Sequence, residues 1–218
     1  MMRLKKCEVG SMAVNCYLLG NPETGEALIV DPGARAERIK QELREENWRP
    51  VAILLTHGHF DHVGAVKNLV TEYHIEVYAG EAEREIFSDL RKVLPSPFYE
   101  VTKKREQYLI SVDHYVKDGE LLELAGMYVT CIATPGHTVG GMSYFLPVET
   151  CVFCGDTLFL ENVGNTTFPT GDEETLYRSI REKLYALPDA TRVFPGHGPA
   201  TNIEYEKRYN MFCRATKK

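Results

Sequence analysis

The sequence lacks the features that mark several classes of protein. No apolar run in the 218 residues approaches the ~18 residues that a membrane-spanning helix needs. The basic residues near the start are followed by no continuous apolar stretch, because Ser11 and Asn15 interrupt it, and we therefore expect no signal peptide. An excess of positive charge is also missing, since 25 Lys and Arg face 31 Asp and Glu and the formal net charge is −6. We expect neither nucleic acid nor an anionic membrane as a partner, because broad binding of either requires a basic face.

Cysteine is sparse for a disulfide-bonded scaffold, with six residues in the chain. Reduced thiols are therefore expected, and they favour a cytoplasmic location. Cys151 and Cys154 have the C-x-x-C spacing, but both lie within an apolar run, which predicts core packing rather than a redox or zinc pair. The single tryptophan, Trp48, is expected to pack in the core or at its rim.

Apolar patterning divides the chain into alternating strands and helices, with no linker-like stretch between them. Short apolar runs predict strands, and apolar residues three and four apart predict helices. Strands are expected at residues 13–19, 27–30, 51–55, 74–79, 121–124, 128–133, 143–146, 151–154 and 191–194, and helices at 35–47, 62–73, 81–94, 173–187 and 202–214. The alternation predicts an α/β fold in one domain spanning residues 1–218, with a sheet covered by helices.

Five of the seven histidines, together with two aspartates, follow the ends of predicted strands. These residues are His57, His59, Asp61 and His62 after the strand at 51–55, His137 after 128–133, Asp156 after 151–154, and His197 after 191–194. Residues two apart in an extended segment point the same way, so His57 and His59 can face one ion. Asp61 and His62 begin the next helix and are turned toward a second position. Imidazole and carboxylate ligands suit zinc, and also iron or manganese, and two such sites about 3.5–4 Å apart make a hydrolytic centre. His74 and His114 lack such company and are expected to be satisfied core groups rather than ligands.

Taken together, these motifs resemble those of the metallo-β-lactamase-fold hydrolases. The segments that carry the resemblance are Asp31-Pro32-Gly33, Thr56-His57-Gly58-His59-Phe60-Asp61-His62-Val63-Gly64, Thr134-Pro135-Gly136-His137-Thr138, Gly155-Asp156-Thr157-Leu158-Phe159 and Pro195-Gly196-His197-Gly198. The resemblance implies an αββα sandwich of two mixed sheets flanked by helices. It also implies two divalent metal ions, with zinc favoured, one held by His57, His59 and His137 and the other by Asp61, His62 and His197.

The resemblance also implies roles for residues around the two metals. Asp156 and a water or hydroxide would bridge the metals, and Asp61 would serve catalysis together with that water. Asp31 resembles the family's aspartate that hydrogen-bonds a ligand histidine and fixes its tautomer. Thr56 and Thr138 are expected to hold the ligand loops by local hydrogen bonds, with ordinary turn chemistry as the alternative.

Within this family, the chain is most similar to short bacterial relatives of hydroxyacylglutathione hydrolase (glyoxalase II). Asn15-Cys16-Tyr17-Leu18 and residues 174–180 carry that similarity, which implies hydrolysis of a small thioester or another ester-like substrate. A thiol has a pKa near ~8.5, so its anion leaves without a strong acid. The chain departs from the group at Gly164-Asn165-Thr166-Thr167, where Gly-Arg-Thr-Asp is usual, and at Gly198-Pro199, where Glu-Tyr is usual. Only 21 residues follow His197, too few for the helical domain that binds glutathione. Glutathione is therefore not implied as the carrier.

Other members of the family leave alternatives open. One is a persulfide dioxygenase with a single iron, and further ones are a lactonase and a phosphodiesterase. A nuclease would be expected to add a basic module, and the short run Lys103-Lys104-Arg105 is more typical of a solvated face. The expected partner is a small-molecule substrate, and the sequence leaves the oligomeric state open.

Residues 81–118 separate two predicted strands by 38 positions, which is long for a plain connection. We predict a lid or insertion near the active site, whose aromatic side chains line the substrate pocket. Phe98 and Tyr99 are the candidate substrate contacts from this segment, and Asn165 is a third. Packing on the outer sheet is the alternative.

Overall fold

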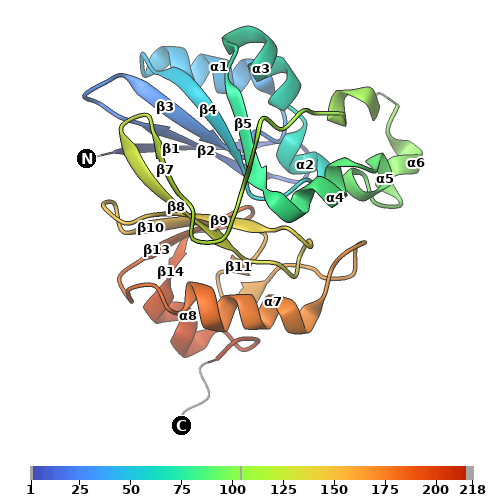
Figure 1. Ribbon diagram of the computed structural model, residues 1–218, viewed down its shortest axis with the longest axis vertical. Helices are drawn as coiled ribbons and strands as arrows, with labels where there is room; N and C mark the ends of the chain where they lie inside the picture. Colours follow the sequence, from blue (N-terminus) through green and yellow to red (C-terminus); the bar gives the residue numbers. More distant parts are fainter. Residues whose placement is uncertain (1, 104, 215–218) are drawn as a thin grey trace.

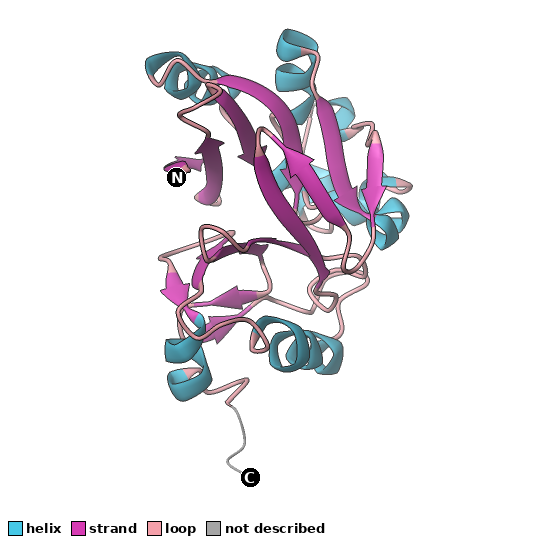
Figure 2. Cartoon of the chain, turned by 60° about the vertical axis from the view of Figure 1, so that its left-hand side comes forward, coloured by secondary structure: helices cyan, strands magenta, loops and turns pink. Residues whose placement is uncertain are grey.

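Two six-stranded sheets lie face to face in the computed structural model, which describes residues 2–103 and 105–214. Helices α1 (Ala36–Glu45) and α3 (Val66–Tyr73) lie beyond the first sheet, and α7 (Glu173–Ser179) and α8 (Ile203–Tyr209) lie beyond the second (Figure 1). Turned by 60°, the same layers appear as strands between helices at the top and bottom (Figure 2). The predicted αββα sandwich is thus confirmed.

The first sheet is formed by the N-terminal half and has the strand order β1-β2-β3-β4-β5-β6. Its strands are β1 (Arg3–Val9), β2 (Val14–Gly20), β3 (Glu26–Val30), β4 (Arg49–Leu55), β5 (Glu76–Gly80) and β6 (His114–Val116). The first three strands pair antiparallel and the last four pair parallel. Parallel neighbours need crossovers, and α1 and α3, the latter preceded by α2 (Phe60–Val63), supply two of them.

The second sheet has the order β14-β13-β10-β9-β8-β7 and is also mixed. Its strands are β7 (Leu121–Leu124), β8 (Met127–Ala133), β9 (Met142–Leu146), β10 (Cys151–Gly155), β13 (Arg192–Pro195) and β14 (Thr201–Asn202). Only β10 and β13 pair in parallel. Between them the chain forms the hairpin β11 (Leu158–Phe159) and β12 (Asn162–Val163), then α7 and a π-helical turn at Ile180–Leu184.

Alternation along the strands places apolar side chains in three separate cores. Odd and even positions of one strand point to opposite faces, so Leu19 and Leu28 pack between the sheets, whereas Leu18 and Ile29 pack under α1 and α3. Val152 and Cys154 of β10 likewise face α7 and α8, while Phe153 faces the first sheet.

Several predicted elements differ in the structure. Strand β1 escapes prediction because Lys5, Lys6 and Glu8 interrupt its apolar pattern at the edge of the sheet. The predicted helix at 62–73 is broken after Val63, where the amide of Ala65 donates to the carbonyl of Pro32. The predicted helix at 81–94 is wrong. That segment forms three single turns instead: Glu81–Glu83, α4 (Arg84–Phe87) and α5 (Leu90–Val93). After it come α6 (Phe98–Val101) and a turn at Arg105–Tyr108.

The predictions for the cysteines and Trp48 are confirmed, whereas the core placement of His74 and His114 is wrong. All six cysteines are free and buried, and Cys151 and Cys154 pack in the core as expected. Trp48 is buried against the first sheet. His74 and His114 lie outside the histidine cluster, but both are exposed rather than in the core. No helix among the described residues has the length and apolar character needed to cross a membrane.

Candidate metal centre

The strand ends bring the seven predicted ligands to one edge of the sandwich. His57 and His59 follow β4, and Asp61 and His62 lie in α2, which begins at Phe60. From the second sheet, β8, β10 and β13 run in the same direction, and they are followed by the remaining three ligand candidates, His137, Asp156 and His197. Each sheet therefore supplies part of one cluster.

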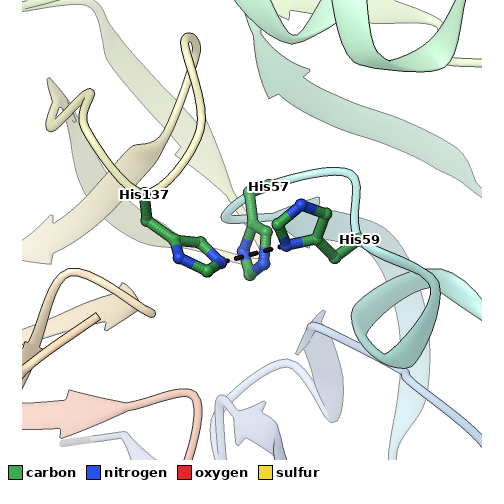
Figure 3. A group of neighbouring side chains, drawn as sticks. All are labelled: His57, His59 and His137. Atoms are coloured by element: carbon green, nitrogen blue, oxygen red, sulfur yellow. Dashed lines mark hydrogen bonds between the residues drawn. The ribbon is translucent and has the colours of Figure 1, made fainter. Parts of the chain in front are cut away.

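The histidines His57, His59 and His137, here called the His57 triad, form the more buried part. Each offers a ring nitrogen within 4.8 Å of the others. The rings meet edge to face with centroids 4.7–4.8 Å apart, and His59 Nδ1 lies 3.0 Å from His137 Nε2 (Figure 3). Three imidazoles that converge edge to face are oriented like the ligands of one cation.

Asp61, His62 and His197, here called the Asp61 triad, form the second part. His197 Nε2 lies 3.5 Å from Asp61 Oδ2, and His62 Nε2 lies 4.0 Å from the same oxygen. His62 is fully buried, whereas the side chains of Asp61 and His197 are 15% and 27% exposed.

Asp156 lies between the two triads. Its Oδ1 is 3.5 Å from His62 Nε2, and its Oδ2 is 3.5 Å from His197 Nε2 and 3.7 Å from His137 Nε2. Gly196 permits this position, because a Cβ there would lie 2.2 Å from Asp156 Oδ1. One carboxylate thus reaches both groups, as a bridging ligand must.

Hydrogen bonds on the outer side orient the ligand rings. The Nδ1 atoms of His62, His137 and His197 lie 2.9, 2.5 and 2.9 Å from Asp31 Oδ2, the carbonyl of Asn165 and the carbonyl of Met12, in that order. These oxygens can only accept from the rings, so each Nδ1 carries a proton and each Nε2 faces the centre.

Asp31 also supports the first loop of the centre. It accepts hydrogen bonds from the amide and hydroxyl of Thr56 at 2.8 and 2.6 Å, and Thr56 Oγ1 lies 3.1 Å from His57 Nδ1. Gly33 makes this close packing possible, because a Cβ there would lie 1.5 Å from the carbonyl oxygen of Asp61. The loop at 31–33 therefore holds ligand residues of both triads.

Glu83 is a supporting residue that the sequence analysis missed. It is fully buried, and its carboxylate accepts from the amides of Gly58 and Gly140 at 2.7 and 3.0 Å and from the hydroxyl of Thr138. Burial raises the pKa of this carboxyl to about 7, although the three donors oppose the shift. Glu83 joins the loop of His57 and His59 to that of His137. Its place in a highly charged segment gave no sign of this contact.

Unpartnered atoms at the centre match the needs of a cation. Nε2 of His57, His59 and His62 and Oδ1 of Asp156 are buried without a hydrogen-bond partner, which is costly unless another group binds them. Burial holds the pKa of His57 and His59 well below the usual range, so their rings are neutral and can offer a lone pair to a cation. Burial also opposes charge on His62, but the carboxylate of Asp156 and then those of Asp31 and Asp61 raise its pKa to about 10. This donor set fits divalent metal ions.

A cavity of about 300 Å³ opens over the centre. The lining consists of ligand candidates, apolar side chains and one amide side chain. The residues are Met12, His59, Phe60, Asp61, Pro95, Phe98, His137, Asp156, Phe159, Asn165, Phe168 and His197. Phe98 and Asn165 are thus at the cavity. The guanidinium groups of Arg91 and Arg105 lie 4.1 and 4.2 Å from the centroid of the Tyr99 ring, and Tyr99 is not part of this lining.

Five apolar residues of the lining were missed from the sequence: Met12, Phe60, Pro95, Phe159 and Phe168. Phe60 and Phe159 lie inside the ligand motifs and could have been found there. Of the basic run at 103–105, Lys103 is exposed and Arg105 also donates to the carbonyl of Tyr99, while Lys104 lies outside the described residues.

Comparison with known proteins gives a consistent result. The profile of the Metallo-beta-lactamase superfamily matches residues 9–197. The probable metallo-hydrolase YqgX of Bacillus subtilis is 36% identical over an alignment that covers 97% of each chain. The hydroxyacylglutathione hydrolase GloC of Haemophilus influenzae is also 36% identical, and the alignment covers 98% of this chain and 99% of GloC.

Solved structures agree with these matches. The crystal structure of BLEG-1 B3 metallo-beta-lactamase aligns with a TM-score of 0.87 at 34% identity, covering 98% of this chain and 100% of that one. The crystal structure of TTHA1623 in a di-iron-bound form aligns with a TM-score of 0.83 at 32% identity, covering 95% and 99%.

Proposed function

The chain belongs to the metallo-beta-lactamase superfamily, and from this membership we propose that it is a two-metal hydrolase of small thioesters or similar esters. The observation that carries the proposal is the bridging position of Asp156 between two complete triads. In the proposed assignment one ion is held by the His57 triad, the other by the Asp61 triad, and Asp156 belongs to both.

Bound divalent ions would supply Lewis acidity and lower the pKa of a water molecule. Asp61 borders the cavity, and its carboxylate would accept a hydrogen bond from such a water and so orient it. His197 Nε2 lies 3.5 Å from the same carboxylate, so an ion bound by both groups would hold that carboxylate in place. Asp31, Thr56 and Thr138 act through the ligand loops that they hold.

A thioester fits the groups at the cavity. The leaving thiolate needs no strong acid, because thiols have a pKa near ~8.5. Among the described residues that line the cavity, none is a Lys, Tyr or Cys that could donate a proton to a poorer leaving group. The name of GloC supports the same reaction class, since it describes a thioester hydrolase.

We propose zinc as the metal, with iron and manganese as alternatives, because histidine and carboxylate ligands accept all three. The di-iron form of TTHA1623 shows that a similar chain can hold two irons. We also propose that residues 81–118 act as a lid, with Phe98 at the cavity. Free, buried thiols support the cytoplasm as the proposed compartment.

A screen of the zinc, iron and manganese forms against thioesters, lactones and phosphodiesters tests the function. Two metal ions per chain and turnover of thioesters are expected, with loss of both in Asp156→Ala. Hydrolysis of thioesters by a metal-stripped sample at the full rate would overturn the proposal. A single iron together with oxygen consumption on a persulfide would instead support a dioxygenase.

A further inference from the structure

The cavity over the metal centre has walls of one chemical type. Outside the ligand candidates, its lining consists of six apolar side chains and Asn165. The rings of Phe60 and Phe98 pack against each other at a tilt of 37°, with 4.6 Å between their centroids, and they form the wall contributed by the N-terminal half. The other wall comes from Phe159 and Phe168 of the C-terminal half.

Each aromatic of the second wall lies beside a ligand candidate. The ring of Phe168 is 5.6 Å from that of His59, and the ring of Phe159 is 6.3 Å from that of His197. A group held between these walls is therefore next to both triads. Each of the four phenylalanines is half-buried, so part of its surface is free to contact a ligand.

An anionic substituent would find neither Lys nor Arg among the described residues that line the cavity. The two carboxylates of the lining, Asp61 and Asp156, belong to the metal centre. A carboxylate of the acyl group that lies between the apolar walls, away from the proposed metal ions, would lose hydration without gaining an ion pair from a side chain, which is unfavourable. A hydroxyl would meet one polar side chain there besides the ligand candidates, Asn165, whose Oδ1 already accepts from the amide of Thr167.

We propose that this cavity selects thioesters or esters with an uncharged, apolar acyl group, and that it disfavours acyl groups with a carboxylate or hydroxyl. The inference deepens the proposed function and rests on it. The cavity of about 300 Å³ has room for such a group, because a dry cavity of roughly 150 Å³ already holds benzene. Each further buried methylene favours binding by about fourfold.

Matched substrates test the selectivity. Phenylacetyl, lactoyl and succinyl thioesters of the same neutral carrier, N-acetylcysteamine, differ only in the acyl group. We expect kcat/KM for phenylacetyl to exceed that for lactoyl by at least about 10-fold and that for succinyl by at least about 100-fold. Equal rates, or preference for lactoyl or succinyl, would overturn the inference while leaving the hydrolase proposal intact.

A positive charge introduced into the cavity wall should change the preference between neutral and anionic acyl groups, which a loss of packing alone would not do. Phe168→Lys should reduce the phenylacetyl to succinyl ratio by at least about 10-fold, whereas Phe168→Leu should keep it within about threefold. Phe212→Lys, an exposed phenylalanine outside the lining, is the matched control and should leave the ratio unchanged. Metal content and Tm of all variants show whether they are folded and loaded. An unchanged ratio in folded Phe168→Lys would contradict the proposed wall.

Measuring binding without turnover tests the selectivity of the cavity independently of the proposed hydrolysis. Ketone analogues, in which a methylene replaces the thioester sulfur, can be titrated by calorimetry. Tighter binding of the phenylacetyl analogue than of the succinyl analogue by at least about 10-fold would support the cavity's selectivity even if no thioester is hydrolysed. Equal or reversed affinities would overturn it.

Discussion

The His57 triad and the Asp61 triad use similar ligand candidates but differ in their access to solvent. All three rings of the first are buried, whereas the Asp61 and His197 side chains of the second are partly exposed. Their supports also differ. Glu83 joins the two loops of the His57 triad from inside the protein, while Asp31 and the carbonyl of Met12 hold the rings of His62 and His197. The more enclosed triad should therefore retain a cation longer and the more open one should exchange it.

The largest effect should come from removing the residue that both triads share. Asp156→Ala is expected to lower kcat/KM by at least about 1000-fold, because it removes a charge that faces both proposed cations. Steady-state kinetics and metal analysis measure the loss. Asp189→Ala, which removes a surface ion pair with Lys207, is the control and should behave like the unchanged protein. Full metal content in Asp156→Ala would contradict the shared position.

The pH dependence of the unfolding free energy of the metal-stripped protein tests Glu83, the support of the His57 triad. Burial raises the pKa of its carboxyl from 4.5 to about 7, so the unfolded chain ionises first as the pH rises. Between these two values the unfolded state binds fewer protons, and this group therefore costs stability progressively, by on the order of 3 kcal/mol above pH ~7. Glu83→Gln should lack that fall.

Urea unfolding of both proteins at pH 4.5 and pH 7.5 measures the difference. Relative to the unchanged protein, Glu83→Gln should gain stability as the pH rises between these values. If the two proteins lose or gain stability in parallel over this range, the carboxyl of Glu83 does not titrate there.

The metal affinities of variants at Asp31 and Glu83 should show which triad each of these two residues supports. Asp31→Asn is expected to weaken the ion of the Asp61 triad by about 10- to 100-fold, because Asp31 contacts His62 directly. Its effect on the ion of the His57 triad should be smaller, because Asp31 reaches His57 only through Thr56. Glu83→Gln should weaken the ion of the His57 triad by a similar factor, because Glu83 holds its loops. Competition with a chelator of known affinity measures both constants. Equal weakening of both ions in each variant would mean that the supports are not specific.

The smallest effect concerns rates in the unchanged protein. Because Asp61 and His197 are partly exposed, a chelator should remove one of two ions faster, by about 10-fold or less. Stopped-flow measurement of metal release should therefore show two phases. Asp31→Asn should accelerate the first phase more than the second, and equal acceleration of both phases would remove the distinction between the triads.

The strand-end motifs could be read from the sequence because each is local. An apolar run followed by histidine or aspartate predicts a strand with that side chain just beyond its end. The seven residues predicted in this way lie together in the structure. Their role as ligands stays a prediction. Glu83 could not be found in this way, since its partners Gly58 and Gly140 are distant in the sequence.

The same reason explains the wrong helix at 81–94 and the failure to predict Phe168 as part of the cavity wall. The pattern there fits a helix, but Glu83 is fixed by contacts with two loops, and the chain turns at Asp89, whose carboxylate caps α5. Phe168 lies in a loop without periodicity, so nothing local marks it as part of a cavity. Strand β1 was hidden because an edge strand needs few apolar residues.

The ligand candidates are divided between the sheets, with four after β4 and three after β8, β10 and β13. A cation bound by residues of both sets links the two sheets of the sandwich and so stabilises their packing. Binding that favours the folded state adds about 2.7 kcal/mol to its stability when the free ion is at 100 times its Kd. The supply of metal in the surroundings would then set how firmly the sheets are joined as well as whether the cavity can act on a substrate.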